Sequence, residues 1–409
     1  MSSWLFALFV TAGLYKADPH LAFIQQRFDM TVLFFFLSFT SFLVQLIRHK
    51  FALRLPKIFW YTFGIFLWIA LLLLLGAVFY DNFHYGLQKA LRFLILTGWA
   101  FLGAALIITD YGRLKQFAWA LLLVATVVAI SALNGWRTGK FVLFAYGLGT
   151  NYLGTARIAG IGLITLTVFL LSVTKSFWIR LLLFVDIVLL FWSLFVSGGR
   201  GPVLAFVITF IFFIILNRKV GRYLQDFSMK RYLRFLNILV FISLIIVALK
   251  GPQWFPTLFM RLRVLLEGGG YSALTRIEYM RMAIEVFSTS PIWGMGPGCL
   301  GKEFFGIDIR LYPHNIFLEF AAEGGLIVLL AFIALLCLAY WNGFRNMRGG
   351  IVPVYLLTVS FFMLLNSMVS GDINDNRMFF VFLSLLTVTK RFISDRDNNL
   401  FWRGAIREH

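Results

Sequence analysis

The chain has 409 residues, of which 60% are hydrophobic and only 13% are charged. A soluble domain of this size has no use for so much apolar surface, so the composition indicates a chain that folds largely in a lipid bilayer. The formal net charge of +19 does not indicate a nucleic-acid partner, because basic residues of membrane proteins gather in cytoplasmic loops and meet anionic lipid.

Twelve apolar runs are long enough, or nearly long enough, to cross the hydrocarbon core of a bilayer. The first, within Met1–Tyr15, has neither the basic start nor the small-residue cleavage site of a signal peptide, and we interpret it as a short span. The sequence therefore predicts an all-α integral membrane protein with about twelve transmembrane helices. The twelve runs cover residues 2–15, 30–47, 58–80, 90–109, 116–134, 158–175, 177–196, 201–217, 234–250, 315–341, 352–370 and 377–390.

The distribution of Lys and Arg predicts the orientation of these spans. If the N-terminus is cytoplasmic, 21 of the 37 basic residues fall in cytoplasmic segments and only nine in short segments on the other side. The other seven lie in the long polar stretch Lys250–Glu323, and long segments are translocated with little regard to charge. The bias predicts cytoplasmic termini and places Lys250–Glu323 on the periplasmic or outer face.

The long polar stretch is expected to fold as a domain, because its Trp, Phe and Tyr side chains can form a core. Ser272–Ser288 have the apolar spacing of a helix that Ser272 can cap and that ends before Pro291. The glycines of Trp293–Gly298 permit close backbone approach, and Phe304–Asp308 are expected to be irregular. The predicted division is 1–250 with spans one to nine, 251–314 as the loop domain, 315–390 with spans ten to twelve, and 391–409 as a cytoplasmic tail.

Two arginines on the predicted outer face are candidates for binding an anion. Arg200 stands between two glycines at the outer ends of two spans, and Arg276 lies on the predicted loop helix. A guanidinium is always charged and its planar fork matches phosphate oxygens. The alternatives are that Arg200 snorkels to lipid phosphate and that Arg276 is simply solvated. Arg281, on the same helix, is a further candidate for substrate binding.

His314 lies where the long stretch re-enters the membrane, beside Asn315, which can start the tenth span. The ordinary pKa of histidine, near 6.5, suits a general base that deprotonates a hydroxyl group. The alternative is a histidine that only hydrogen-bonds to the backbone at the start of a helix. Glu319 and Glu323 follow in the apolar run, where a carboxylate is costly, and each could orient His314 or pair with an arginine.

The short outer segment Gly371–Arg377 carries further polar candidates. Asp372 and Asp375, near Arg377, could serve the same site or form only a solvated turn. The chain has no nucleotide-binding Gly-rich loop, no nucleophilic serine motif and no acidic pair on the outer face for a divalent metal. The spans are nearly free of charge, which favours chemistry at one membrane face over transport.

Residues 195–325 resemble the O-antigen ligase and O-antigen polymerase superfamily. The resemblance implies a membrane glycosyltransferase of the GT-C type in the bacterial inner membrane, with one large periplasmic loop domain and no metal or cofactor. The donor would be a glycan on undecaprenyl pyrophosphate, with Arg200 and Arg276 binding the pyrophosphate and His314 as the base or acceptor-orienting group. The motifs that carry the resemblance are Ser-Gly-Gly-Arg200-Gly, Ser-Ala-Leu-Thr-Arg276-Ile-Glu-Tyr, Gly294-Met-Gly-Pro-Gly and Pro-His314-Asn-Ile-Phe-Leu-Glu.

The resemblance leaves two acceptors open. A ligase transfers the glycan to a sugar hydroxyl of lipid A–core, and a polymerase transfers it to another lipid-linked repeat unit. A single large outer loop favours the ligase here. Two alternatives from other classes are a transporter of lipid-linked sugars and a scaffold protein whose arginines bind only anionic lipid.

Overall fold

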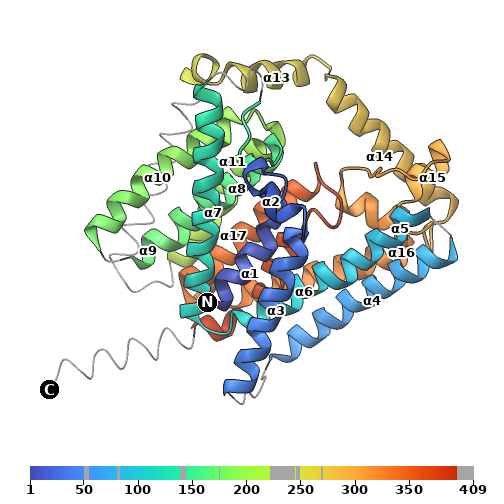
Figure 1. Cartoon of the computed structure of the whole chain (residues 1–409), viewed down its shortest axis with the longest axis horizontal. Helices are drawn as coiled ribbons and strands as arrows, with labels where there is room; N and C mark the ends of the chain where they lie inside the picture. Colours follow the sequence, from blue (N-terminus) through green and yellow to red (C-terminus); the bar gives the residue numbers. More distant parts are fainter. Residues whose placement is uncertain are drawn as a thin grey trace.

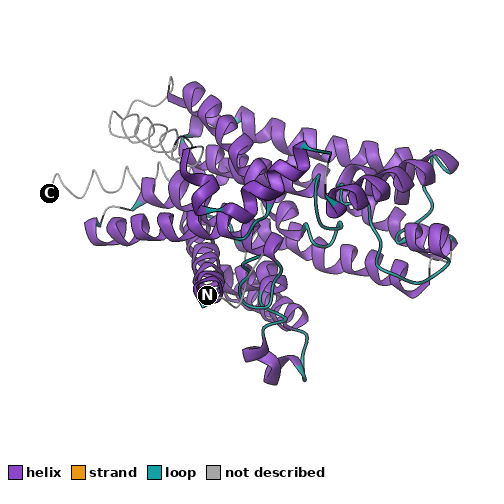
Figure 2. Cartoon of the chain, turned by 90° about the horizontal axis from the view of Figure 1, so that it is seen from above, coloured by secondary structure: helices purple, strands orange, loops and turns teal. Residues whose placement is uncertain are grey.

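The computed structural model describes residues 1–49, 55–80, 83–138, 144–174, 176–221, 245, 249–268 and 270–393. All regular structure in these ranges is helical (Figures 1 and 2). Among the residues described, eight helices are long and apolar enough to cross a membrane, so the chain is a multi-pass membrane protein.

Eleven of the twelve predicted apolar runs coincide with helices. Three of these helices are shorter than a full span, namely α1 (Ser2–Thr11), α17 (Ile351–Ser367) and α18 (Arg377–Thr387). The one remaining run, the ninth at 234–250, lies almost entirely outside the described residues. The count of twelve therefore stays a prediction. The eight long spans are α3 (Met30–His49), α4 (Lys57–Phe79), α5 with η3 and α6 (Phe83–Arg92, Phe93–Thr97, Gly98–Ile107), α7 (Tyr111–Arg137), α8 with η4 and α9 (Tyr152–Ile164, Thr165–Leu170, Leu171–Val173), α10 (Phe177–Val196), α11 (Arg200–Gly221) and α16 (Ile316–Arg345).

Aromatic rings and glycines hold the spans together. The ring of Phe66 on α4 lies 5.1 Å from Phe93 and 5.3 Å from Phe101 between ring centroids, which joins α4 to the next span. A Cβ on Gly160 would lie 2.4 Å from the ring of Phe362, so α8 and α17 approach through a glycine. Close packing of this kind is what stabilises helices in lipid, where apolar burial alone gives no driving force.

The stretch between α11 and α16 contains three helices, α13 (Pro256–Leu266), α14 (Tyr271–Thr289) and α15 (Cys299–Phe305). In Figure 1, α13 lies at the top of the molecule and α14 descends from there to α15, beside α16. The helix predicted at Ser272–Ser288 is confirmed, although its N-cap is Gly270. The expectation that Phe304–Asp308 are irregular is wrong for Phe304 and Phe305. These two residues form the end of α15, before Gly306. Short turns elsewhere are η1 (Ala12–Leu14), η2 (Pro19–Leu21), α2 (Ala22–Gln25) and η5 (Met347–Gly349).

A break in α16 receives the glycine-rich loop. Gly325 has φ +64° and ψ −166°, so the helix opens there and exposes backbone groups. The carbonyl oxygens of Ala322 and Glu323 accept hydrogen bonds of 2.9 Å from the N–H groups of Met295 and Gly296. A Cβ on Gly325 would lie 2.2 Å from the carbonyl oxygen of Ile292. The predicted close backbone approach of this loop is therefore confirmed.

Gly325→Ala is expected to lower the thermal unfolding midpoint of the purified protein. The left-handed conformation alone costs a side-chain-bearing residue about 1–3 kcal/mol, and the Cβ must also displace the backbone of Ile292. Gly64→Ala on α4 is the matched control, because a Cβ there meets no atom within 4 Å. Equal midpoints for the two variants would contradict the tight docking of the loop.

Candidate active site

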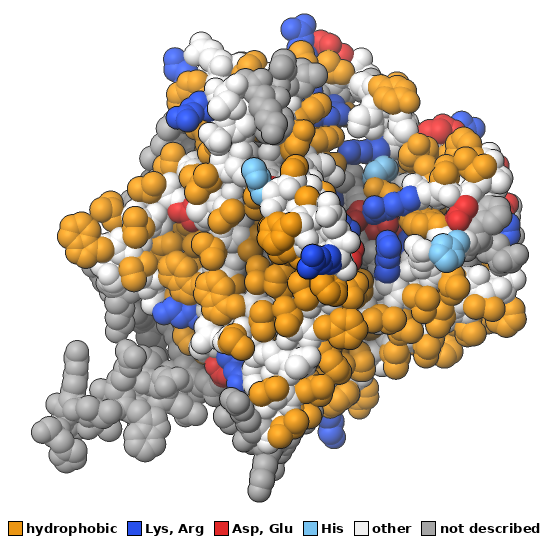
Figure 3. Space-filling view, viewed as in Figure 1, with side chains coloured by type: hydrophobic (Ala, Val, Ile, Leu, Met, Phe, Trp, Pro, Cys, Tyr) orange, Lys and Arg blue, Asp and Glu red, His pale blue; other side chains and the backbone are white. Residues whose placement is uncertain are grey.

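A polar cavity of about 630 Å³ lies where α1, α8, α17 and α18 meet the segment that leads into α16. In Figure 3, Lys, Arg, Asp, Glu and His side chains gather around a hollow in a mostly hydrophobic surface. The charge bias predicts that the segments lining this cavity share the membrane face of the long loop. The charged and aromatic lining includes Lys16, Arg157, Arg310, Tyr312, His314, Asp375 and Arg377.

His314 borders the cavity in a left-handed backbone conformation, with φ +56°. Its ring lies 4.5 Å from the Tyr312 ring and stacks at 6.2 Å on Tyr279 of α14, between ring centroids. Asn315 caps α16, as predicted, by accepting from the N–H groups of Phe317 and Leu318. The Nδ1 atom of His314 is buried and has no hydrogen-bond partner among the described residues. No backbone hydrogen bond therefore holds Nδ1, and the unusual backbone conformation of His314 is typical of functional sites.

The surroundings of His314 keep its ring neutral. Burial, followed by the positive charges of Arg276, Arg157 and Arg310, lowers the pKa of His314 to about 4. The pKa of Tyr312 is raised to about 12 by burial and by the carboxylate of Asp375, so its hydroxyl stays protonated at neutral pH. The site thus holds an imidazole that can accept a proton beside a phenol that can donate a hydrogen bond.

The pH dependence of transfer tests this ionisation state. Because the folded pKa of His314 is near 4, kcat/KM should show no acid limb near pH 6.5 and should fall only as the pH approaches 4. The free energy of unfolding should also fall with pH. Below about pH 6.5 the unfolded chain binds a proton at His314 and the folded chain does not, so His314 makes the fold less stable as the pH falls from 6.5 towards 4. His314→Gln should remove this slope in thermal unfolding. An acid limb near pH 6.5 that arises from His314 would contradict a pKa near 4 for this residue in the folded protein.

Arg276 lies near both Arg200 and His314, which the sequence placed only on the same face. The charge of Arg276 acts on both His314 and Arg200. Arg200 donates a 2.8 Å hydrogen bond to the carbonyl oxygen of Arg261, and Arg261 donates one of 2.6 Å to that of Gly198. The two arginines line neither this cavity nor the groove described below. The hydrogen bonds donated by Arg200 and Arg261 hold α13 against the start of α11.

The guanidinium groups of this cluster lack acidic partners. Within the described ranges, no carboxylate forms an ion pair with Arg157, Arg200, Arg261 or Arg276. Arg157 donates a 2.6 Å hydrogen bond to the carbonyl oxygen of Ser370, while its buried Nε atom has no partner there. Arginines held by carbonyl oxygens keep their full positive charge, so the cluster favours a multiply charged anion. Sequence reasoning missed Arg157, whose only signal is an arginine at the start of an apolar run.

The aspartates of the segment before α18 pair with an arginine that sequence reasoning missed. Arg310 forms ion pairs of 2.9 Å with Asp372 and 2.7 Å with Asp375. Although burial acts against it, these carboxylates raise the pKa of Arg310. Neither aspartate forms an ion pair with Arg377 in the described part of the chain. The guanidinium of Arg377 instead lies 5.2 Å from the centre of the Phe9 ring, and its buried Nε has no partner in the described part of the chain.

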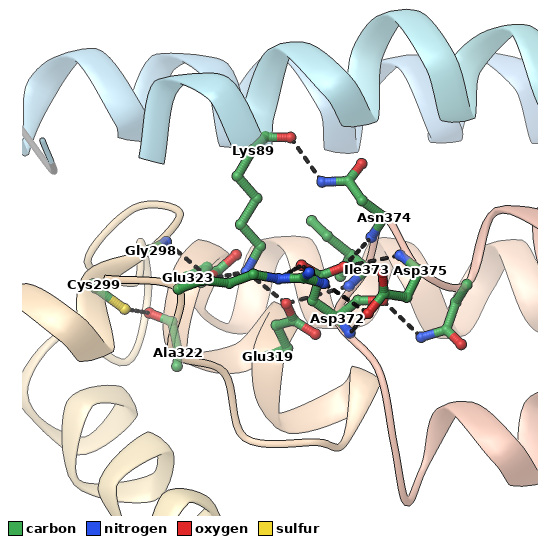
Figure 4. Close-up of polar contacts among 12 residues, drawn as sticks. Lys89, Gly298, Cys299, Glu319, Ala322, Glu323, Asp372, Ile373, Asn374 and Asp375 are labelled. Carbon is green, nitrogen blue, oxygen red and sulfur yellow. Dashed lines mark hydrogen bonds and ion pairs between the residues drawn. The ribbon is translucent and has the colours of Figure 1, made fainter. Parts of the chain in front are cut away.

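The two glutamates are joined by a lysine that was also missed (Figure 4). Lys89 of α5 reaches both Glu319, at 2.5 Å, and Glu323, and all three side chains are almost fully buried. The expectation that these glutamates orient His314 or pair with an arginine was wrong. Glu323 also accepts from the N–H of Gly298, at 2.9 Å, and Glu319 from that of Ile373, at 3.3 Å. Lys89 therefore ties α5, α16, the glycine-rich loop and the segment before α18 together.

The matched family covers much of this site. Residues 185–333 match the family model described as O-antigen ligase. Over these residues the chain is similar to the O-antigen ligase superfamily. A search of curated proteins found no match to the chain.

The resemblance inferred from the motifs is thus confirmed. The O-antigen ligase segment contains Arg200, Arg276, His314 and both buried glutamates. Lys89, Arg157 and the aspartates that hold Arg310 lie outside the segment and reach it only in the folded chain. Arg281, by contrast, is exposed on α14 and lines neither of the cavities described here.

Proposed function

We propose that this protein is a membrane glycosyltransferase that moves a glycan from undecaprenyl pyrophosphate to a sugar hydroxyl of lipid A–core. In this proposal it lies in the bacterial inner membrane with both termini in the cytoplasm and the cavity at the periplasmic face. The observation that carries the proposal is a neutral His314 at a polar cavity, next to guanidinium groups without carboxylate partners. The match to the O-antigen ligase family supports the reaction class.

The arrangement suits a single displacement at the anomeric carbon. The acceptor oxygen forms the new bond to that carbon while the bond to the pyrophosphate oxygen breaks, and the hydroxyl proton passes to a ring nitrogen of His314. Negative charge then grows on the departing pyrophosphate, where Arg200 and Arg276 would stabilise it more strongly than in the bound donor. No metal or other cofactor has a role in this proposal.

The remaining candidates have separate parts in this scheme. Asp372 sets the position of Arg310 at the cavity wall, and Arg377 is available to a bound anion. Glu319 and Glu323 are too buried to meet a bulky glycan, so we assign them to positioning through Lys89.

The deciding experiment incubates the purified full-length protein with a glycan on undecaprenyl pyrophosphate and with lipid A–core. A ladder of glycan on the core supports the ligase. Extension of the lipid-linked chain instead makes the protein a polymerase, which the family equally allows. Movement of the donor across a liposome membrane with no new glycosidic bond would overturn the proposal in favour of a transporter.

A further inference from the structure

A second cavity, a groove of about 380 Å³, lies between α3 and the span formed by α5 and η3. One part of its lining, here called the apolar wall, comes from α3 and from α5 with η3. It consists of Val32, Phe35, Phe36, Leu91, Ile95 and Leu96. Phe36 and Ile95 are 58% and 50% exposed on membrane-spanning helices, so this wall faces lipid. The groove therefore offers a hydrocarbon chain a place to lie at the protein–lipid boundary.

The upper end of the groove is positively charged. Lys89 and Arg310 also line it, but both are committed to carboxylates. Lys16, Arg92 and Arg377 also line the groove and form no ion pair within the described ranges. Asp29, whose charge interacts with that of Lys16, is occupied in capping α3, where it accepts a hydrogen bond from the N–H of Thr31. An apolar wall below uncommitted cations matches a lipid that carries phosphate at its head.

The groove leads into the polar cavity that His314 borders. Lys16, Thr31, Arg310, Asn374, Asp375 and Arg377 line both. Asn374 also fixes the segment before α18 to the span formed by α5 and η3, because its amide donates to the carbonyl oxygen of Lys89, at 3.0 Å, and its Oδ1 accepts from Thr97, at 3.5 Å. Thr97 ends the π-helical segment η3, a rare geometry that is frequent at functional sites.

Two groups of arginines occur at the site, and only one of them lines the groove. Arg276 connects His314 to Arg200 and α13, whereas Arg310 and Arg377 connect the cavity to the groove. A single displacement needs the attacking hydroxyl on the face of the sugar opposite the leaving group. If the donor pyrophosphate occupies the Arg200 side, the acceptor must approach from the other side.

We propose that the groove between α3 and η3 binds the acceptor lipid, with a hydrocarbon chain against Phe36 and Ile95 and its phosphate near Lys16, Arg92 and Arg377. This assignment of acceptor over donor rests on the proposed function. The occupant is lipid A–core, which carries both hydrocarbon chains and phosphate.

The test measures equilibrium binding to the full-length protein in nanodiscs, one ligand at a time, so no turnover is needed. Ile95→Trp fills the groove, and Leu71→Trp, at an exposed position of α4 outside it, is the matched control. Ile95→Trp should weaken binding of lipid A–core about tenfold, equivalent to losing roughly two buried methylenes, and leave the deacylated core oligosaccharide and the donor lipid within twofold. Arg92→Gln, at an exposed position, should weaken phosphorylated lipid A–core and spare its dephosphorylated form.

Unchanged binding of lipid A–core to both variants would overturn the proposal. Weaker binding of the donor lipid to Ile95→Trp would assign the groove to the donor and overturn it as well. If lipid A–core binds as expected but no glycan is transferred when both substrates are present, the groove stands as a lipid site and the proposed function fails.

Discussion

Arg276→Ala is expected to lower the rate of glycan transfer by about 10²–10³-fold, while the protein folds normally. Arg276 lies on the extramembrane helix α14, and its charge acts on His314 and on Arg200. Removing it takes away stabilisation of the leaving pyrophosphate. Arg276→Lys should recover only part of the rate, because a lysine keeps the charge but not the planar fork that holds two phosphate oxygens.

The measurement is kcat and KM for the donor with purified protein, together with the pH profile. Arg281→Ala makes the same change on the same helix at an exposed position, and it should stay within twofold of the wild type. Loss of Arg276 also removes a positive charge that lowers the pKa of His314, so that pKa should rise. A variant with normal kcat and an unshifted pH profile would show that Arg276 is only solvated.

Lys89→Met is expected to prevent stable folding. The lysine is the cationic partner of Glu319 and Glu323 in the interior, and its removal leaves two carboxylates that water does not reach. Breaking a buried ion pair on one side costs about 3–5 kcal/mol, a large part of the stability of most domains. The yield of monodisperse protein and the thermal unfolding midpoint report the loss.

A triple variant separates charge from shape. Lys89→Met combined with Glu319→Gln and Glu323→Gln leaves no buried charge and should regain most of the folded protein. The carbonyl oxygens of the two glutamines can still accept from the N–H groups of Gly298 and Ile373. If Lys89→Met alone unfolds at the wild-type midpoint, the lysine does not neutralise the glutamates as described.

The membrane helices could be predicted from the sequence because hydrophobic length is a local property. Eleven of the twelve apolar runs match helices, and the helix α14 was located within one residue at each end. The clearest error has a physical cause. The fourth run was predicted to start at residue 90, because a lysine ends an apolar run, yet the spanning helix starts at His84 and carries Lys89 inward. The ion pairs that accommodate this charge come from α16, which no local pattern reveals.

The motifs and the charge bias, read from the sequence alone, determined which side chains share a membrane face. They picked out Arg200, Arg276 and His314, since an arginine between glycines or a histidine at a membrane boundary is unusual wherever it stands. The approach of Arg276 to the other two was decided by the tertiary structure, which also joins α13 to α11 by hydrogen bonds and docks the glycine-rich loop on α16.

The ionisation of His314 also depended on the fold. Its pKa is set by burial and by the guanidinium groups of Arg276 on α14, Arg157 on α8 and the nearby Arg310, so the ordinary value near 6.5 expected for a general base does not apply. The pairing of Arg310 with Asp372 spans 62 residues, and that of Lys89 with Glu319 spans 230. Hydropathy and residue type act locally and determine where helices form and which end carries charge. Electrostatic pairing acts through space, so only the packed chain decides which charges are neutralised and which stay free to bind an anion.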